Sequence, residues 1–170
     1  MLFNSAVFLL LFLAFYLLYW PLPIKWKHAL IILASMIFYL WYDFYFLLLF
    51  LFILGFSYIL SLYLLKNRSR LVLVLGLVVV LGNLCFFKYF YLFAHSLGAL
   101  LGDAYLADLR VNWQRDYKFT IVLPIAISFY TFQIVAYLVD CYRGTIGERV
   151  PLRKYVVFIL YFPQFIAGPI

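Results

Sequence analysis

Apolar residues fill long runs of this chain, and short polar segments separate the runs. The first run covers residues 1–20 and ends at the breaker Pro21-Leu22-Pro23. The second covers residues 29–65, which is too long for a single membrane crossing of about 20 residues. Asp43 lies inside this second run among Tyr and Trp residues, which are typical of a membrane interface. The pattern predicts three membrane-spanning helices, with a turn at Asp43 between the second and the third.

Three further apolar segments follow a basic turn at residues 66–70. They cover residues 71–93, 119–139 and 155–166. The first two have the length of a membrane span. The last is short and contains Pro163, which predicts a broken or re-entrant element, because irregular backbone is tolerated at membrane depth where protein covers it.

The fold class predicted from this pattern is an all-α integral membrane protein. We expect about five to six transmembrane helices in a single polytopic domain over residues 1–170, with a polar connector at residues 96–118. Hydrophobic residues make up 69% of the chain and charged residues 11%, against about half and about a quarter in soluble domains. This composition excludes a large soluble domain, a disordered tail, a disulfide-stapled secreted domain and a nucleic-acid-binding protein.

Lys and Arg residues are distributed unevenly between the predicted loops. Nine lie in the first, third and fifth loops, and three lie in the second and fourth. Cytoplasmic loops of membrane proteins are enriched in Lys and Arg. The asymmetry therefore predicts a cytoplasmic location for the odd-numbered loops and an N-terminus outside. The net charge of +7 is accordingly assigned to a membrane surface.

Polar side chains are costly inside a bilayer, so those expected at membrane depth are candidates for function or for joining helices. Four of them recur at i, i+3, i+7 and i+10, which places them within about 80° on one helix face. They are Tyr130, Gln133, Tyr137 and Asp140. One interpretation is that this stripe lines a cavity for a polar substrate. The other is that it joins neighbouring helices by hydrogen bonds, with Asp140 marking the interface near Arg143.

Signatures of soluble-type catalysis and of metal binding are absent from the sequence, which has no glycine-rich phosphate loop, HExxH, GxSxG or Cys/His cluster. His28 and His95 lie outside any polar constellation. Cys85 and Cys141 lack a CxxC spacing and are interpreted as small apolar residues. Lys88 is interpreted as a lysine that snorkels from a helix end. The residues alone therefore assign neither a catalytic group nor a metal ligand.

Four segments, in order, resemble the membrane-bound O-acyltransferase family, in the branch that contains alginate O-acetyltransferases and the D-alanyl transferases of teichoic acid. They are the opening MLFNS with its apolar run, NLCFFKYF at residues 83–90, LPIAISFYTFQIVAYLVDCYRG at residues 123–144 and YFPQFIAGPI at residues 161–170. The resemblance makes Lys88, Arg143 and Gln164 candidate motif residues. The sequence departs from the family pattern at Trp41-Tyr42-Asp43-Phe44, where a proline is usual after the aromatic pair.

The resemblance implies transfer of a short acyl group, expected to be acetyl, to a hydroxyl of an extracytoplasmic cell-envelope polysaccharide. The implied donor is a cytoplasmic thioester, either acetyl-CoA or an acyl carrier, and no bound cofactor is implied. A tunnel through the protein would bring the two substrates together, with the polar stripe in its wall. The family's catalytic histidine, a general base, is expected beyond Ile170, so the 170 residues would be an N-terminal part that is inactive alone.

The same resemblance implies a bacterial inner membrane protein. Its expected partners are the lipid bilayer, the rest of the acyltransferase chain, envelope or carrier proteins and the polysaccharide acceptor. Two other functions stay open. One is a non-catalytic membrane scaffold or truncated paralogue, which a continuation bearing a membrane-embedded histidine would exclude. The other is a lipid-linked sugar transporter, which inverted internal symmetry would favour, and no such repeat is visible.

Overall fold

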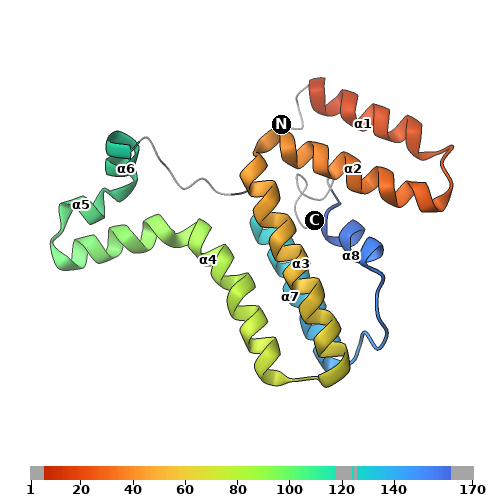
Figure 1. The fold of residues 1–170 in the computed structure, drawn as a ribbon. Coiled ribbons are helices and arrows are strands. Elements are labelled where there is room, and N and C mark those ends of the chain that lie inside the picture. Colours follow the sequence, from red (N-terminus) through yellow and green to blue (C-terminus); the bar gives the residue numbers. More distant parts are fainter. Residues whose placement is uncertain (1–5, 118–123, 125, 162–170) are drawn as a thin grey trace.

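The computed structural model describes residues 6–117, 124 and 126–161, and the regular structure in these residues is entirely helical (Figure 1). The helices are α1 (Ala6–Tyr19), α2 (Ile24–Tyr42), α3 (Phe44–Asn67), α4 (Arg70–Leu101), α5 (Ala104–Ala107), α6 (Leu109–Tyr117), α7 (Ile127–Arg143) and α8 (Leu152–Ile159). The predicted all-α fold class is confirmed.

Asp43 divides the second apolar run into α2 and α3, as predicted. Its backbone is extended, with φ −167° and ψ 133°. Its Oδ1 atom accepts hydrogen bonds from the backbone N–H groups of Tyr45 and Phe46 at 2.7 and 3.2 Å. A carboxylate in this position satisfies donors that a new helix would otherwise leave unpaired. Asp43 therefore ends one helix and caps the next.

The bundle is built from α3, α4 and α7, which contact one another, and α8 packs against α2, α3 and α7. Figure 1 shows α3 and α7 side by side along most of their length. Gly76 lies where α4 packs closely against both α3 and α7. A Cβ atom there would collide with the side chain of Leu60 on α3 and would lie 3.7 Å from Leu138 on α7. Small residues of this kind let helices pack closely where no water separates them.

The basic turn predicted at residues 66–70 is confirmed. The helix α3 ends at Asn67 and is followed by Arg68, which is in the left-handed conformation with φ 43°, and α4 begins at Arg70. The helix α7 ends at Arg143 and is followed by Gly144, with φ 81°. The guanidinium of Arg68 lies against Gly144, since a Cβ atom there would be 2.5 Å from Nη2. The α3–α4 turn and the C-terminus of α7 therefore meet at one end of the bundle.

Two predicted helix boundaries are wrong. The helix α4 does not stop near residue 93 but continues to Leu101, because the first left-handed residue after it is Gly102, with φ 70°. The predicted polar connector 96–118 is therefore part helix α4 and part α5 and α6. The helix predicted at 119–139 is α7, which begins at Ile127 after the left-handed Ala126 and extends to Arg143 because no breaker precedes Gly144.

The predicted count of five to six spans is not confirmed. In the described residues, α2, α3 and α4 are the helices that are long and apolar enough to cross a membrane. The helix α1 has 14 residues, α7 has 17 and α8 has 8, below the about 20 residues of a span. The predicted broken element around Pro163 lies outside the described residues.

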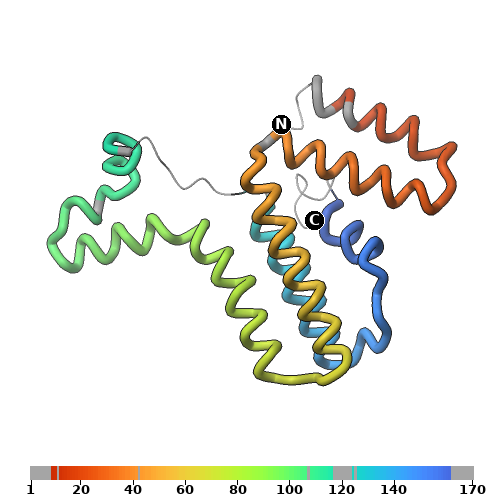
Figure 2. The backbone as a smooth tube through the Cα atoms, in the orientation of Figure 1, coloured from red at the N-terminus to blue at the C-terminus, as the bar shows by residue number. Residues whose placement is uncertain are grey.

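Beyond the bundle, α4 carries a separate group of helices. The tube in Figure 2 shows α4 turning away from α3 and α7 in its second half. The short helices α5 and α6 pack on this second half. We call residues 90–117, the end of α4 together with α5 and α6, the lateral arm.

Candidate functional site

The predicted polar stripe lies on α7, which packs against both α3 and α4. Tyr130 and Tyr137 are buried, and Gln133 and Asp140 are half-buried. Phe132, on another face of the same helix, is 60% exposed. The stripe therefore points mainly into the bundle, where neighbouring helices supply its surroundings.

Tyr130 lies at one end of the stripe, between α3 and α4. Its ring meets Phe50 of α3 edge-on, with 4.8 Å between the ring centroids. Its hydroxyl is buried and has no hydrogen-bond partner among the described residues. Asn83 of α4 is close enough to interact with this hydroxyl, yet its own Nδ2 atom is also buried without a partner in the described part of the chain. The Oγ1 atom of Thr131 is also buried and has no hydrogen-bond partner among the described residues.

Tyr137 lies two helical turns further along α7 and belongs to a cluster of three tyrosines. Its ring lies 4.7 Å from that of Tyr155 on α8, which in turn lies 5.4 Å from that of Tyr58 on α3. The hydroxyl of Tyr58 donates a hydrogen bond to the carbonyl oxygen of Val150 at 3.1 Å. The hydroxyl of Tyr137 is buried and has no hydrogen-bond partner in the described residues. The cluster therefore joins three helices while leaving one hydroxyl unused.

Two fully buried serines of α3 face this cluster. The hydroxyl oxygens of Ser57 and Tyr155 lie 2.7 Å apart. The Ser57 hydroxyl donates to the carbonyl oxygen of Leu54 at 3.0 Å, so the proton between Ser57 and Tyr155 comes from the tyrosine. Ser61, one turn later, donates to the carbonyl oxygen of Tyr58 at 2.7 Å and is close enough to interact with Tyr137.

We call this set of buried polar side chains the polar seam. It comprises Ser57, Tyr58, Ser61, Asn83, Tyr130, Thr131, Tyr137 and Tyr155. Of these residues, the sequence pattern predicts only Tyr130 and Tyr137 as site residues. The spacing of Ser57 and Ser61 at i and i+4 inside an apolar run was an available signal for α3. No signal was available for Tyr155, because its burial depends on how α8 packs.

The polar seam contains hydroxyl and amide groups but no ionisable base. A buried polar group without a partner costs about 1–3 kcal/mol, and buried polar groups in proteins usually have partners. The unpartnered hydroxyls of Tyr130, Thr131 and Tyr137 can therefore accept or donate hydrogen bonds to a hydroxyl-bearing molecule. They cannot by themselves remove a proton from one.

The other predicted site residues lie apart from the seam. Lys88 is exposed on α4, with its Nζ atom 5.4 Å from the centroid of the Tyr89 ring. Arg143 is the exposed last residue of α7 and makes no ion pair with Asp140. Gln164 lies outside the described residues. His95 is exposed on α4.

Three side chains considered as reactive groups also lie outside the seam. His28 is half-buried on α2, and its Nδ1 atom has no hydrogen-bond partner among the described residues. Cys85 is exposed, Cys141 is buried, and both are free thiols. Within the described part of the chain, no group of three His, Cys, Asp or Glu residues could hold a metal ion.

Comparisons with known proteins identify the relatives of this chain. It is 36% identical over 176 residues to the probable alginate O-acetylase AlgI of Azotobacter vinelandii, which it matches with its whole length. It is 35% identical to the probable alginate O-acetylase AlgI of Pseudomonas aeruginosa and 30% identical to the peptidoglycan O-acetyltransferase of Helicobacter pylori. The chain is a homologue of part of these O-acetyltransferases. The resemblance seen in its four motifs is confirmed.

The homology covers a limited share of each relative. The chain spans 34% of the Azotobacter protein, 32% of the Pseudomonas protein and 37% of the Helicobacter protein, in their N-terminal parts. No family model matches the chain, and no solved structure matches it. The three apolar helices of membrane-spanning length in the described residues are consistent with a multi-pass membrane protein.

Proposed function

We propose that this chain forms part of a membrane-bound enzyme that transfers an acetyl group from a thioester to a hydroxyl of a cell-envelope polysaccharide. The homology to O-acetyltransferases of alginate and peptidoglycan carries this proposal. The membrane is the bacterial inner membrane, and the N-terminus is outside. The donor is acetyl-CoA or an acetylated carrier protein on the cytoplasmic side.

The polar seam is part of the wall of the path that leads a substrate hydroxyl to the reaction. Its support is the set of buried, unpartnered polar atoms on Tyr130, Thr131, Tyr137 and Asn83. A sugar presents several hydroxyl groups that can both donate and accept, so it satisfies such groups without placing a charge in the membrane. Neutral phenols also hydrogen-bond a hydroxyl without competing for its proton.

The two interpretations of the stripe apply to different parts of it. The contacts of Tyr155 with Ser57 and of Tyr58 with Val150 join helices, because both partners are satisfied within the protein. The Tyr130 end has buried groups whose hydrogen-bonding capacity is unused in the described residues. We therefore assign helix joining to the satisfied hydroxyls of Ser57, Tyr58 and Tyr155, and substrate contact to the unpartnered groups, which are concentrated around Tyr130.

In the reaction, the substrate oxygen attacks the thioester carbonyl carbon, a C–O bond forms, and the C–S bond breaks to release the thiol. The hydroxyl proton must pass to a base, which lowers the barrier when it is positioned within hydrogen-bond reach. The seam supplies no such base, and His28 and His95 lie outside it. We assign the base to the remainder of the complete enzyme, as the family resemblance implies.

The basic end of the bundle is where the donor arrives. Arg68 and Gly144 are in contact there. Lys66 near the C-terminus of α3, Arg70 at the N-terminus of α4 and Arg143 at the C-terminus of α7 are exposed. Coenzyme A and the pantetheine arm of a carrier protein both carry phosphate, which clustered positive charge attracts. An acidic carrier protein would be steered to the same surface.

The test is chemical analysis of the envelope. Cells that lack the gene are expected to lose ester-linked acetyl groups from an envelope polysaccharide and to regain them when the complete protein is restored. The complete enzyme, purified and supplied with labelled acetyl thioester and that polysaccharide, should form labelled ester. An unchanged acetyl content in the deletion strain, together with no ester formation in vitro, would contradict the proposal.

A further inference from the structure

The helix α4 is longer than a bilayer crossing requires. It has 32 residues, which at 1.5 Å per residue is a length of about 48 Å. The hydrocarbon core of a bilayer is about 30 Å thick. If α4 enters the membrane near Arg70, about 12 residues remain beyond the far surface. Figures 1 and 2 show that these residues do not continue straight but turn away from the bundle.

A belt of aromatic residues marks where α4 reaches the far surface. Residues 86–91 read FFKYFY, with five aromatic residues and Lys88. They lie about 24–32 Å along the helix from Arg70, which matches the thickness of the hydrocarbon core. Tyrosine is enriched at membrane–water interfaces, and lysine there extends its ammonium group into the headgroups. The turn away from the bundle therefore begins at the level of the membrane surface.

Past the belt, the two sides of α4 differ. Ala94 and Gly98 are buried, and these small residues belong to the part of α4 on which α5 and α6 pack. On another face, Leu92, Phe93 and Leu100 are 62, 71 and 83% exposed. At 100° per residue, these three lie within about 100° of one another. The exposed Ser96 lies on the same face, and its hydroxyl donates to the carbonyl oxygen of Leu92 at 3.0 Å. The second half of α4 is thus covered on one side and mainly apolar and uncovered on the other.

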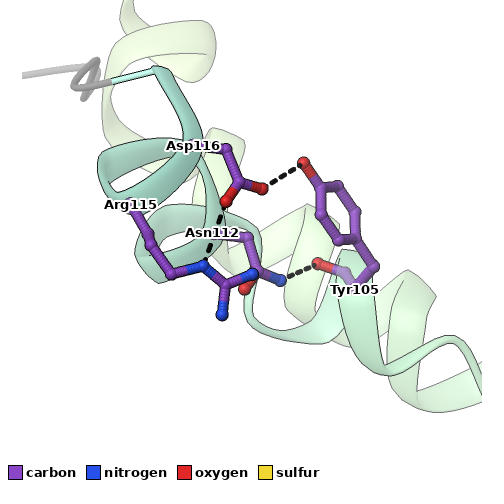
Figure 3. A network of polar contacts seen from close by, with 4 residues as sticks. All are labelled: Tyr105, Asn112, Arg115 and Asp116. Carbon is purple, nitrogen blue, oxygen red and sulfur yellow. Dashed lines mark hydrogen bonds and ion pairs between the residues drawn. The ribbon is translucent and has the colours of Figure 1, made fainter.

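The short helices that cover one side are held together by polar contacts (Figure 3). Asn112 donates through Nδ2 to the carbonyl oxygen of Tyr105 at 3.0 Å, and the hydroxyl of Tyr105 donates to Asp116 at 3.4 Å. Arg115 donates through Nε to the same carboxylate at 3.0 Å, and this hydrogen bond raises the pKa of the guanidinium. Trp113 ties the group to α4, with its ring 5.6 Å from that of Phe90. The helices α5 and α6 therefore form one connected unit, and polar side chains lie on its surface.

The uncovered apolar face continues the outward face of the first half of α4. Leu75, Val78 and Phe86 are exposed in that half, and at 100° per residue they share an arc of about 80° with Phe93 and Leu100. In the first half this face points away from the bundle, toward lipid. Because α4 then turns away from α3 and α7, the same face points back toward the membrane in the second half.

We propose that the lateral arm lies along the membrane surface as an interfacial anchor, with the apolar face of residues 92–101 inserted into the lipid and α5 and α6 on its aqueous side. An amphipathic helix in such a position places its apolar face about 5–10 Å into the boundary between headgroups and acyl chains. The lipid bilayer is thus the binding partner of the apolar face of residues 92–101. The inference rests on the membrane location of the bundle and is independent of acyl transfer.

Spin labels on single cysteines test the arm directly. The full chain, with Cys85→Ala and Cys141→Ala, is labelled at Leu100→Cys or at His95→Cys and reconstituted in vesicles of phosphatidylethanolamine and phosphatidylglycerol. Both positions are exposed, but they lie about 140° apart on the helix. Collisions with oxygen report hydrocarbon, and collisions with nickel-EDDA report water. A label at Val78→Cys serves as the reference for a position inside the membrane.

The proposal predicts an oxygen-to-nickel collision ratio several-fold higher at residue 100 than at residue 95, with residue 100 shallower than residue 78. A high collision rate with nickel at both positions would overturn it, because the arm would then lie in water. Exclusion of both reagents at residue 100 would also overturn it, because protein rather than lipid would then cover the face. A label at Phe93→Cys, about 160° from residue 95 on the helix, repeats the comparison in case Leu100→Cys disturbs folding.

Discussion

The hydroxyl groups of Ser57 and Tyr155 lie 2.7 Å apart although 98 residues separate them in the chain. This contact holds the short helix α8 against α3, together with the ring contact of Tyr155 with Tyr137 on α7. The neighbouring hydroxyl of Tyr137 makes no such bond in the described residues. The hydroxyl of Tyr155 therefore contributes to helix packing, whereas, among the described residues, that of Tyr137 does not.

This difference predicts opposite effects of the same chemical change. Tyr155→Phe removes a satisfied hydrogen bond and is expected to destabilise the protein by about 1 kcal/mol. Tyr137→Phe removes a hydroxyl that has no partner in the described residues, so stability should be unchanged or higher. Thermal unfolding in detergent, followed by circular dichroism, measures both. Equal destabilisation by the two substitutions would contradict the assignment.

Two glycines of α4 provide a matched pair for the packing of the bundle. Gly76→Leu should destabilise the bundle, because even a Cβ atom at this position meets the side chain of Leu60 and overpacking typically costs about 1–3 kcal/mol. Gly82→Ala meets nothing within 4 Å and should stabilise the helix by up to about 1 kcal/mol. The midpoint of thermal unfolding distinguishes them. A Gly76→Leu protein as stable as the original would show that α4 does not approach α3 as described.

The orientation in the membrane is tested at the α3–α4 turn. The uneven distribution of Lys and Arg predicts that this turn is cytoplasmic. With Cys85 and Cys141 replaced by alanine, a cysteine placed at Ser69 should resist a membrane-impermeant thiol reagent in intact cells and react after the cells are opened. Labelling in intact cells would show that the turn is outside and that the predicted orientation is wrong.

The purified 170-residue chain is expected to show no acetyl transfer above background. The polar seam holds no histidine or carboxylate that could act as a base; His28 lies on α2 and His95 on α4, and neither belongs to the seam. Loss of a general base typically lowers a rate by several orders of magnitude. A measured transfer that His95→Ala abolishes would move the catalytic site to α4.

Local signals in the sequence predicted the turns but not the seam. Asp43 and the basic residues 66–70 interrupt apolar runs, and each lies where the structure ends one helix and begins another. The periodicity of α7 predicted which residues share a face. It could not predict the partners of that face, because the contact of Tyr155 with Ser57 depends on the packing of helices far apart in the chain.

The end of α4 was mispredicted for a related reason. Hydropathy falls after residue 93, and a polar segment there was interpreted as the end of a helix. Polar residues such as His95 and Ser96 can adopt helical backbone angles, so the helix continues until the left-handed Gly102. As a result, α4 is longer than its membrane span, and its last residues form part of the lateral arm.

The unpartnered groups of the polar seam around Tyr130 are expected to contact the substrate. Comparing Tyr130→Phe with Tyr58→Phe in the complete enzyme tests this contact, with acetyl transfer and thermal stability as the two measurements. Both substitutions remove one buried or half-buried phenolic hydroxyl, but that of Tyr58 is bonded to the carbonyl oxygen of Val150 and that of Tyr130 has no partner in the described residues.

We expect Tyr130→Phe to lower kcat/KM by about tenfold, which corresponds to the loss of one hydrogen bond of about 1.4 kcal/mol in the transition state. The thermal stability of this variant should be unchanged or higher. Tyr58→Phe should lower stability by about 1 kcal/mol and leave the activity of the folded enzyme unchanged. Full activity of Tyr130→Phe, with a loss of stability like that of Tyr58→Phe, would contradict the claim and make the seam a purely structural feature.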